Sequence, residues 1–325
     1  MIDADGPATL ESALERHRVE LTGYCYRMLG SPFEAEDAVQ DTMVRAWKGY
    51  DRFEGRAQLR SWLYRIATNV CLDMLGSKER KVRPTDFMSV GSAENPSLTQ
   101  HPENTWLAPT PDHKVLVGGD PADVAVARDS VRLAFVAALH HLPARQRAVL
   151  ILREVLCWQA TEVAELLDTS VASVNSALQR ARATLAATDV AATDLAEPAD
   201  EDQKALLAKY VKAFESYDLE ALAGLLHEDV TLSMPPYELW LLGAAEINTW
   251  MLGPGSGCRG SRLVPVESAN GTPTFGQYRP SGPGGAFEPW ALQVIEIHDG
   301  RIVGLNSFLD TDRLFPLFGL PPTVE

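Results

Sequence analysis

The chain contains few cysteines for its length. Its 325 residues include only Cys25, Cys71, Cys157 and Cys258, which form no CxxC pair and have no histidine at zinc-finger spacing. This scarcity excludes a disulfide-rich secreted fold, and the scattered thiols fit a reducing compartment. We therefore expect free, buried thiols, and we predict neither a metal site nor a cofactor.

Long hydrophobic runs are also absent. The amino-terminal stretch MIDADGPATLESALERH is acidic and polar and has no apolar centre, which excludes a typical signal peptide. No apolar stretch approaches the roughly 18 residues that a membrane-spanning helix needs. We expect a cytoplasmic protein with no membrane segment.

Positive charge is scarce in the chain as a whole. Lys and Arg number 29 against 44 Asp and Glu, and the formal net charge is −15, so the average surface repels phosphate. The distribution is uneven, however, because residues 56–83 are rich in Arg and Lys whereas residues 197–229 are dominated by Asp and Glu. An acidic surface and a DNA-binding surface can therefore be separate parts of the molecule.

Segment 159–185, QATEVAELLDTSVASVNSALQRARATL, predicts two short helices around a tight turn. Apolar residues recur at three- and four-residue spacing, which predicts one buried side on each helix. This pattern is typical of a helix-turn-helix, whose second helix enters the major groove of DNA. The predicted buried residues are Val163, Ala164, Leu166 and Leu167 in the first helix and Val171, Val174, Leu178 and Ala181 in the second.

The opposite side of the second helix carries polar side chains. Asn and Gln can pair with adenine edges, Arg with guanine or phosphate, and Ser with either. This side therefore has the chemistry that major-groove recognition requires. Its residues are Ser173, Asn175, Ser176, Gln179, Arg180 and Arg182.

The apolar pattern divides the chain into five parts. Helical periodicity covers residues 9–83, where Val44 and Trp47 follow the apolar pattern, and returns at 124–188, so we expect two all-α domains. Residues 84–123 carry repeated prolines, which predicts a flexible extended linker that Trp106 and Leu107 can anchor. Residues 189–202 form a short acidic linker before a third domain at 203–325.

The third domain changes character from helices to strands. Two short amphipathic helices come first, residues 230–234 are β-like, and residues 290–308 alternate around the turn-forming dipeptide Asp299-Gly300. This order predicts an α+β domain in which helices pack on one face of a curved antiparallel sheet. Four aromatic residues are candidates either for lining a ligand cavity or for the core, namely Trp240, Trp250, Tyr278 and Trp290.

Three segments of the first two domains resemble bacterial sigma factors of the extracytoplasmic-function (ECF) type, which keep only sigma regions 2 and 4. They are EAEDAVQDTMVRAW from Glu34, RSWLYRIATNVCLDML from Arg60 and LPARQRAVLILREVLCWQATEVAELLDTSVASVNSALQRARATL from Leu142. Their order and separation make the resemblance specific, whereas a helix-turn-helix alone would be shared with many transcriptional regulators.

The resemblance implies partners and roles for particular residues. Asp37, Gln40 and Asp41 would dock on the β′ clamp helices of core RNA polymerase, and region 4 would contact the β flap. Region 2 would read the minus-10 element, and the second helix of the helix-turn-helix would read the minus-35 element with Arg182 on phosphate. Many relatives have Gly where Asp168 stands, but Asp tolerates a left-handed backbone. The expected minus-10 residues are Arg56, Arg60, Arg65 and Asn69.

The third domain resembles SnoaL-like members of the nuclear-transport-factor-2-like superfamily, which are cone-shaped α+β domains with an internal cavity. The resemblance rests on YVKAFESYDLEALAGLLHEDVTLSMPP and on PWALQVIEIHDGRIVGLNSFLD. It implies regulation in cis and a cavity that can hold a small-molecule ligand. The expected fold class is thus multidomain: two all-α sigma domains, a region 2 helical bundle and a region 4 helix-turn-helix, followed by an α+β cone-shaped SnoaL-like domain.

The leading hypothesis is a promoter-specific initiation factor that is monomeric when free and has no catalytic residues. One alternative is a one-component regulator in which a ligand of the third domain controls a helix-turn-helix that binds DNA without polymerase. A second alternative is a bifunctional protein with an active SnoaL-like enzyme, whose candidate acid-base residues are His227, Asp229, His298 and Asp310.

Overall fold

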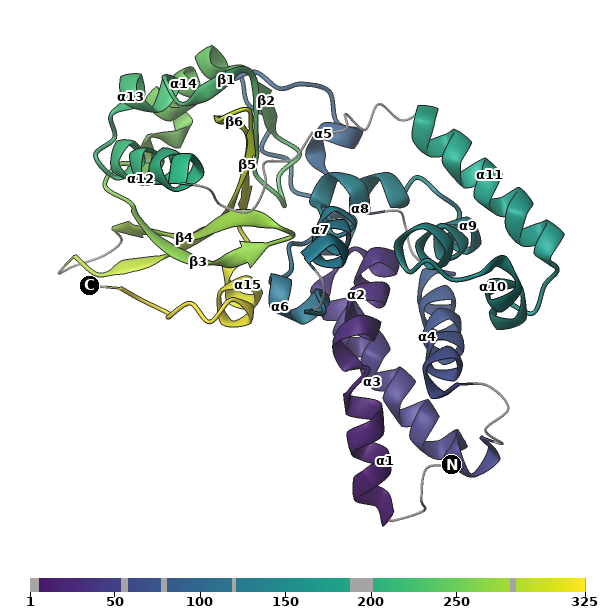
Figure 1. Ribbon diagram of the computed structural model, residues 1–325. Helices are drawn as coiled ribbons and strands as arrows, with labels where there is room; N and C mark the ends of the chain where they lie inside the picture. Colours follow the sequence, from purple (N-terminus) through teal and green to yellow (C-terminus); the bar gives the residue numbers. More distant parts are fainter. Residues whose placement is uncertain are drawn as a thin grey trace. The chain divides into compact units, whose positions relative to one another are not determined.

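The computed structural model describes residues 6–53, 58–76, 81–118, 121–187, 201–280 and 285–324 (Figure 1). The chain forms two compact units. Unit 1 comprises residues 1–81 and 107–191, and unit 2 comprises residues 82–106 and 192–325. Arg56, one of the predicted minus-10 residues, and most of the predicted acidic linker lie outside the described residues.

Unit 1 is helical, and local sequence signals explain where its main helices begin and end. Ser31 precedes α3 and accepts a hydrogen bond from the Glu34 amide, with Pro32 at the first helical position. Gly30 ends α2 in the left-handed conformation (φ 70°). The helices are α1 (Gly6–Glu15), α2 (Arg18–Leu29), α3 (Pro32–Gly49), α4 (Leu59–Leu75), α6 (Asp112–Val115), α7 (Pro121–Asp129), α8 (Leu133–Leu139), α9 (Ala144–Leu150), α10 (Ala160–Leu166) and α11 (Val171–Ala187).

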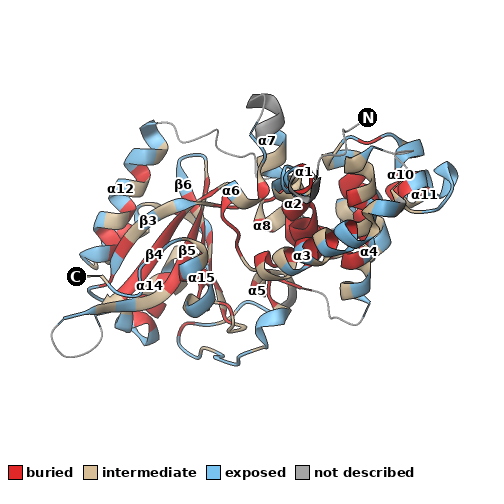
Figure 2. Cartoon of the chain, turned by 90° about the horizontal axis from the view of Figure 1, so that it is seen from below, coloured by how far each residue is buried: buried red, intermediate tan, exposed pale blue. Residues whose placement is uncertain are grey.

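The two predicted helical domains, called region 2 and region 4 here after the family they resemble, share one hydrophobic core, which Figure 2 shows as a band of buried residues through unit 1. In region 2, the Tyr24 and Tyr64 rings meet edge to face at 5.2 Å, and the Tyr24 hydroxyl is 2.8 Å from that of Thr68. Tyr64 also contacts Trp158 of region 4, with 5.1 Å between ring centroids. The sequence predicted two separate helical domains, whereas the structure packs them together.

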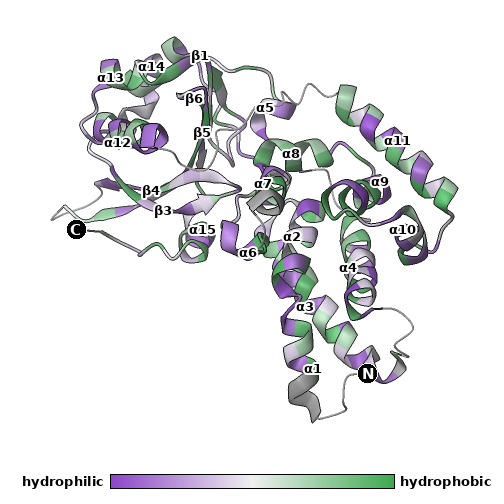
Figure 3. Cartoon of the chain, in the orientation of Figure 1, coloured by the Kyte–Doolittle hydropathy of each residue, from purple (hydrophilic) through white to green (hydrophobic). Residues whose placement is uncertain are grey.

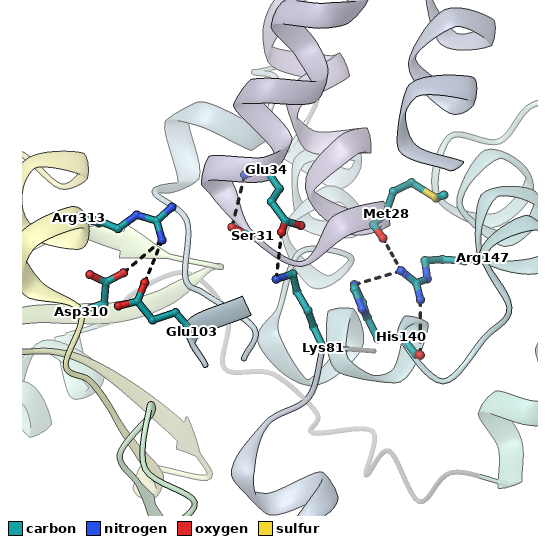
Figure 4. Close-up of polar contacts among 9 residues, drawn as sticks. All are labelled: Met28, Ser31, Glu34, Lys81, Glu103, His140, Arg147, Asp310 and Arg313. Carbon is teal, nitrogen blue, oxygen red and sulfur yellow. Dashed lines mark hydrogen bonds and ion pairs between the residues drawn. The ribbon is translucent and has the colours of Figure 1, made fainter. Parts of the chain in front are cut away.

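A buried arginine joins region 4 to region 2 (Figure 4). Arg147 of α9 donates hydrogen bonds to the carbonyl oxygens of Leu139, His140 and Leu142, and to that of Met28 at the end of α2. These carbonyls lie at or just after helix ends, where backbone acceptors have no partner within the helix and carry partial negative charge. The guanidinium thus caps two helices, one from each of the two regions.

Arg27 makes a second junction of the same kind. Its guanidinium donates to the Ser130 hydroxyl at 2.7 Å and to the Ala127 carbonyl at 3.3 Å, at the end of α7. Burial lowers the pKa of Arg27 to about 10, so the side chain remains a cation at neutral pH. Both arginines therefore hold segments outside region 2 against α2.

Unit 2 contains a six-stranded sheet in the order β2-β1-β6-β5-β4-β3. The strands β1 and β6 are parallel and the other neighbours are antiparallel, so the predicted antiparallel sheet is in fact mixed. The predicted hairpin turn is confirmed, because Asp299 and Gly300 both have positive φ, at 46° and 68°. The strands are β1 (Leu226–Ser233), β2 (Trp240–Leu242), β3 (Arg262–Ala269), β4 (Thr272–Pro280), β5 (Phe287–His298) and β6 (Arg301–Phe308).

Helices cover both faces of the sheet. On one face α12 (Glu201–Glu215), α13 (Leu219–Ala223) and α14 (Ala244–Leu252) enclose a core that includes Trp250 (Figure 1). On the other face α15 (Thr311–Leu317) places Phe315 edge to face against Tyr278, 5.2 Å between centroids. Trp250 and Tyr278 are both buried, so for these two residues the structure favours a place in the core over the lining of a ligand cavity.

A segment that we call the strap, residues 82–106, lies along the β2 edge of the sheet. The Gly91 amide donates to the Trp240 carbonyl at 2.9 Å, and the Glu238 amide donates to the Thr99 carbonyl at 3.0 Å. The Trp240 indole donates to the Met88 carbonyl at 2.8 Å. The strap therefore covers backbone groups that an edge strand would otherwise expose.

The end of the strap is anchored by Trp106. Its side chain is buried, and its indole donates to the Pro236 carbonyl at 3.1 Å. His101 approaches Glu238 at 3.1 Å, and Leu107, the next residue after the strap, is buried in the unit 1 core. The anchoring role predicted for Trp106 and Leu107 agrees with these contacts. The prediction of a flexible linker is wrong for residues 84–106, because backbone hydrogen bonds to distant residues order this proline-rich segment.

Candidate nucleic-acid interface

The helix-turn-helix of α10 and α11 forms through local signals. The Gln159 amide donates to the Glu162 carboxylate at 2.7 Å at the start of α10, and Ser170 caps α11 by accepting from the Ser173 amide at 3.2 Å. Between the helices Asp168 has a φ of 50°, the left-handed conformation expected of it. The turn therefore forms without glycine at this position.

The α11 helix has the two sides that its sequence predicted, with one exception. Val174, Leu178 and Ala181 are buried, but Val171 is 38% exposed because it stands in the first turn, beyond the edge of α10. Arg182 forms an ion pair with Glu154 at 2.6 Å. The six predicted DNA-contacting residues are all exposed: Ser173, Asn175, Ser176, Gln179, Arg180 and Arg182.

The predicted minus-10 residues of α4 have different surroundings. Asn69 is exposed, whereas Arg60 donates to Glu20 at 2.8 Å and lies over the rings of Tyr64 and Trp158, at 5.2 and 5.5 Å from their centroids. Burial disfavours the charged form of Arg60, but the neighbouring Tyr64 and Glu20 outweigh it and raise its pKa. Arg60 is therefore held as a cation against aromatic rings, although 39% of its side chain remains exposed.

Arg65 points from α4 to α10 and donates a hydrogen bond to the Glu165 carbonyl. Beside Arg65, Trp62 is partly exposed and stacks on Phe53, with 4.8 Å between the ring centroids. Its ring is therefore partly packed against other side chains and partly open to solvent. An open groove of about 240 Å³ lies between the two helices at this point. It is lined from α4 by Ser61, Trp62 and Arg65 and from α10 by Glu162, Glu165 and Leu166.

The α3 helix presents a surface of mixed polarity (Figure 3). Asp37 and Gln40 are exposed, and Asp41 pairs with Arg45 at 2.8 Å. Val44 and Trp47 are 48% and 45% exposed, although their spacing placed them in the apolar pattern of the helix. Periodicity could not separate these two residues from the core, because the apolar pattern on α3 is wider than the side that its neighbours cover.

The candidate acid-base residues of the third domain do not form one cluster. On β1, His227 is partly buried and Asp229 is exposed, with 4.0 Å between them, while His298 ends β5 beside Asp299. Asp310 precedes α15 and lies 3.7 Å from Arg313, which also pairs with Glu103 of the strap (Figure 4). Burial raises the pKa of Asp310. The described residues contain no His, Cys, Asp and Glu cluster suited to a metal ion.

Comparison with known proteins places these features in a family. Models of sigma-70 region 2, sigma-70 region 4 and a SnoaL-like domain match residues 13–81, 132–185 and 207–305. The ECF RNA polymerase sigma factor SigG of Mycobacterium tuberculosis is 43% identical over 320 residues, which cover 95% of this chain and 83% of SigG. The chain belongs to the ECF RNA polymerase sigma factors. The interpretation as a sigma factor with a SnoaL-like third domain is thereby confirmed.

A second relative extends over nearly the same length. The M. tuberculosis ECF sigma factor SigJ is 26% identical over 318 residues, covering 93% of this sigma factor and 92% of SigJ. The crystal structure of SigJ matches with a TM-score of 0.60 at 22% identity, covering 96% of this chain and all of SigJ. This match supports the expected fold class, helical sigma regions followed by a SnoaL-like domain with a sheet. In the described part of this sigma factor no helix is long and apolar enough to cross a membrane.

Proposed function

We propose that α11 reads the minus-35 element, that α4 reads the minus-10 element, that α3 docks on core RNA polymerase, and that the SnoaL-like domain regulates these steps in cis. The observation that carries the proposal is the polar side of α11, whose six side chains are exposed over three buried apolar ones. A rigid helix with Asn, Gln and Arg along one side suits recognition of base edges in the major groove.

The polymerase-binding surface combines charge with an aromatic side chain. Asp37, Gln40 and Asp41 give α3 an acidic surface suited to a basic partner, and Val44 and Trp47 add exposed apolar area beside them. Interfaces draw much of their affinity from a few buried aromatic residues surrounded by polar ones. Trp47 is therefore the residue of α3 that we expect to matter most for binding polymerase.

The strap supports the proposal of regulation in cis. It is the chain that leads out of region 2, and its backbone groups pair with unit 2. Binding to the SnoaL-like domain can therefore influence the sigma regions through the chain itself. A ligand in the domain would act if it bound more tightly to one arrangement of the strap than to another.

Transcription with core polymerase on a promoter library tests the proposal. The full chain should give promoter-specific transcripts, and the Asn175→Ala, Arg180→Ala double variant should lose them while still binding core polymerase. The matched control is Thr169→Ala, an exposed residue of the turn that lies outside the proposed recognition surface. Unchanged promoter choice by the double variant would disprove the assignment of α11.

The same assay gives the sign of regulation. A chain that ends at Ala187 lacks the sheet on which the strap lies, so it should be compared with a full-length Glu238→Ala variant that loosens the strap from Glu238 only. Higher activity in both would indicate inhibition by the SnoaL-like domain, and lower activity in both would indicate assistance. Wild-type activity in both would disprove regulation in cis.

A further inference from the structure

A cluster of cationic and aromatic side chains surrounds Cys258 of the SnoaL-like domain. Arg279 of β4 donates a hydrogen bond from Nη2 to the Cys258 sulfur at 3.5 Å, and its guanidinium carbon lies 3.3 Å from the centroid of the Trp290 ring. Arg259 follows Cys258 in the sequence and lies over the Tyr217 ring, 4.9 Å from its centroid. Two arginines on aromatic rings therefore flank one partly buried thiol.

The two arginines have no carboxylate to neutralise them. Among the residues that the structure describes, neither Arg259 nor Arg279 forms an ion pair, although the whole chain carries 44 Asp and Glu against 29 Lys and Arg. Glu288 stands opposite Arg279 in the pairing of β4 with β5, yet the guanidinium contacts the thiol and the indole instead. The Arg279 Nε atom is buried and has no hydrogen-bond partner in the described chain. An arginine has five N–H donors, so this pair of cations can receive an anion that binds beside the sulfur.

The positions of the two cations are set by their surroundings. A Cβ atom at Gly257 would lie 2.8 Å from Arg279 Nη2, so only glycine lets the guanidinium come this close to the chain. The Trp290 ring lies against the same guanidinium, in a cation–π contact. The Tyr217 hydroxyl donates to the Met251 carbonyl, which fixes the ring on which Arg259 lies. Side chains held in this way lose little freedom when an anion binds.

We propose that Cys258 is a site of reversible S-thiolation, at which Arg259 and Arg279 bind the carboxylates of an anionic low-molecular-weight disulfide. Cys258 releases its proton to solvent, and its thiolate attacks one sulfur of the disulfide. The disulfide bond of the reagent breaks, a bond forms between Sγ and the attacked sulfur, and the other half leaves as a thiolate that takes up a proton. Cys258 is oxidised and the departing sulfur is reduced, so no other oxidant is needed. The two arginines attract the incoming anion and stabilise the departing thiolate.

The other three cysteines serve as references in the same chain. The prediction of buried thiols is confirmed for Cys25 and Cys71 and is wrong for Cys157, which is exposed. The Cys157 thiol donates to the Glu154 carbonyl at 3.9 Å and contacts no arginine among the described residues. Exposure alone predicts that Cys157 reacts faster than Cys258 with every disulfide, whereas the proposal predicts that Cys258 prefers anionic ones.

Disulfide exchange on the full chain tests the proposal. The protein is treated at pH 7 and about 20 mM salt with glutathione disulfide, a dianion, or with cystamine, a dication. Mass spectrometry after an acid quench gives the rate of adduct formation at each cysteine. The rate with glutathione disulfide divided by the rate with cystamine is the quantity compared, because the intrinsic reactivity of each thiol cancels in it.

Three substitutions locate the effect. Arg279→Gln and Arg259→Gln each remove one cation beside the sulfur. The matched control is Arg262→Gln, because Arg262 also lies over an aromatic ring, 4.3 Å from the Phe287 centroid, but does not contact Cys258. Melting of each variant shows whether unit 2 stays folded. Arg259 is exposed, so its replacement keeps the test valid if Arg279→Gln destabilises the domain.

The expected result is a preference for the anion at Cys258 alone. The ratio at Cys258 should exceed the ratio at Cys157 about tenfold, and about 0.5 M salt should remove most of this difference. Arg279→Gln and Arg259→Gln should each lower the Cys258 ratio by about threefold to fivefold, and Arg262→Gln should leave it unchanged. A reductant should remove the adduct and restore the thiol.

Three results would overturn the proposal. The first is the absence of any glutathione adduct at Cys258 in the folded chain. The second is an equal ratio at Cys258 and Cys157, which would show that the arginines do not select the reagent. The third is a ratio at Cys258 that neither Arg259→Gln nor Arg279→Gln changes, or that Arg262→Gln lowers equally.

Discussion

Arg147 is the buried charge on which the junction between the sigma regions depends, and its replacement should be costly. Arg147→Met keeps a long side chain but removes the donors that satisfy the carbonyls of Leu139, Leu142 and Met28. A hydrogen bond from a charged donor contributes about 1.5–3 kcal/mol, and a buried carbonyl left unpaired costs about 1–3 kcal/mol. Because these terms overlap, we expect a net loss of about 3–5 kcal/mol in the free energy of unfolding.

Calorimetry and hydrogen exchange together measure this loss. One kcal/mol shifts Tm by about 2–4 °C in a unit of this size, so unit 1 should melt roughly 6–20 °C lower. Hydrogen exchange read by mass spectrometry should locate the weakening in α8, α9 and the end of α2. Arg145→Met, on the same helix but exposed, is the control and should change the free energy of unfolding by less than about 0.5 kcal/mol.

Two outcomes would refute the reasoning about Arg147. If Arg147→Met melts at the temperature of Arg145→Met, the buried guanidinium contributes nothing beyond its volume. If α8 and α9 lose protection while the end of α2 keeps it, the guanidinium caps region 4 only, and its bond to Met28 does not join the two sigma regions.

Three further predictions concern binding and the turn. Trp47→Ala should weaken core polymerase binding by about 2 kcal/mol, roughly 30-fold, without lowering Tm. The control is Leu252→Ala, which removes an exposed apolar side chain of unit 2. Equal effects of the two variants on polymerase binding would count against docking by α3. In promoter binding by the holoenzyme, Asn175→Ala should remove about 1–3 kcal/mol of discrimination at one base pair. Arg182→Ala should instead reduce the slope of log affinity against log salt concentration by about 0.9. The opposite pattern would assign base contact to Arg182 and phosphate contact to Asn175. Asp168 has a φ of 50°, which a β-branched residue adopts only at a cost. Asp168→Val should therefore destabilise unit 1 by about 1–2 kcal/mol in urea unfolding, whereas Asp168→Gly should not. Equal stability of the two variants would show that the turn does not require a residue that accepts positive φ.

Features that depend on neighbours in sequence could be predicted from the sequence. The turn at Asp168 and the hairpin at Asp299 and Gly300 follow from which residues accept a positive φ. The polar side of α11 follows from the 3.6-residue period of its apolar residues. The apolar side of the helix packs on its neighbours, and the polar side is left exposed. In these places local preference and the final structure agree.

Features that depend on distant partners could not be predicted. Val44 and Trp47 follow an apolar period, but only the packing of α2 and α4 decides that they face solvent. The prolines of the strap suggested a flexible linker, yet its order comes from backbone groups of residues 236–240, which lie far along the chain. The parallel pairing of β1 with β6 is likewise set by the topology of the whole domain rather than by either strand.

The residues at the two ends of the strap are bound to region 2. Lys81, just before the strap, is buried and pairs with Glu34 of α3 at 3.5 Å, and the Ala108 amide, just after it, donates to the Gly30 carbonyl at 3.0 Å. The residues that flank the strap on both sides are therefore fixed to region 2.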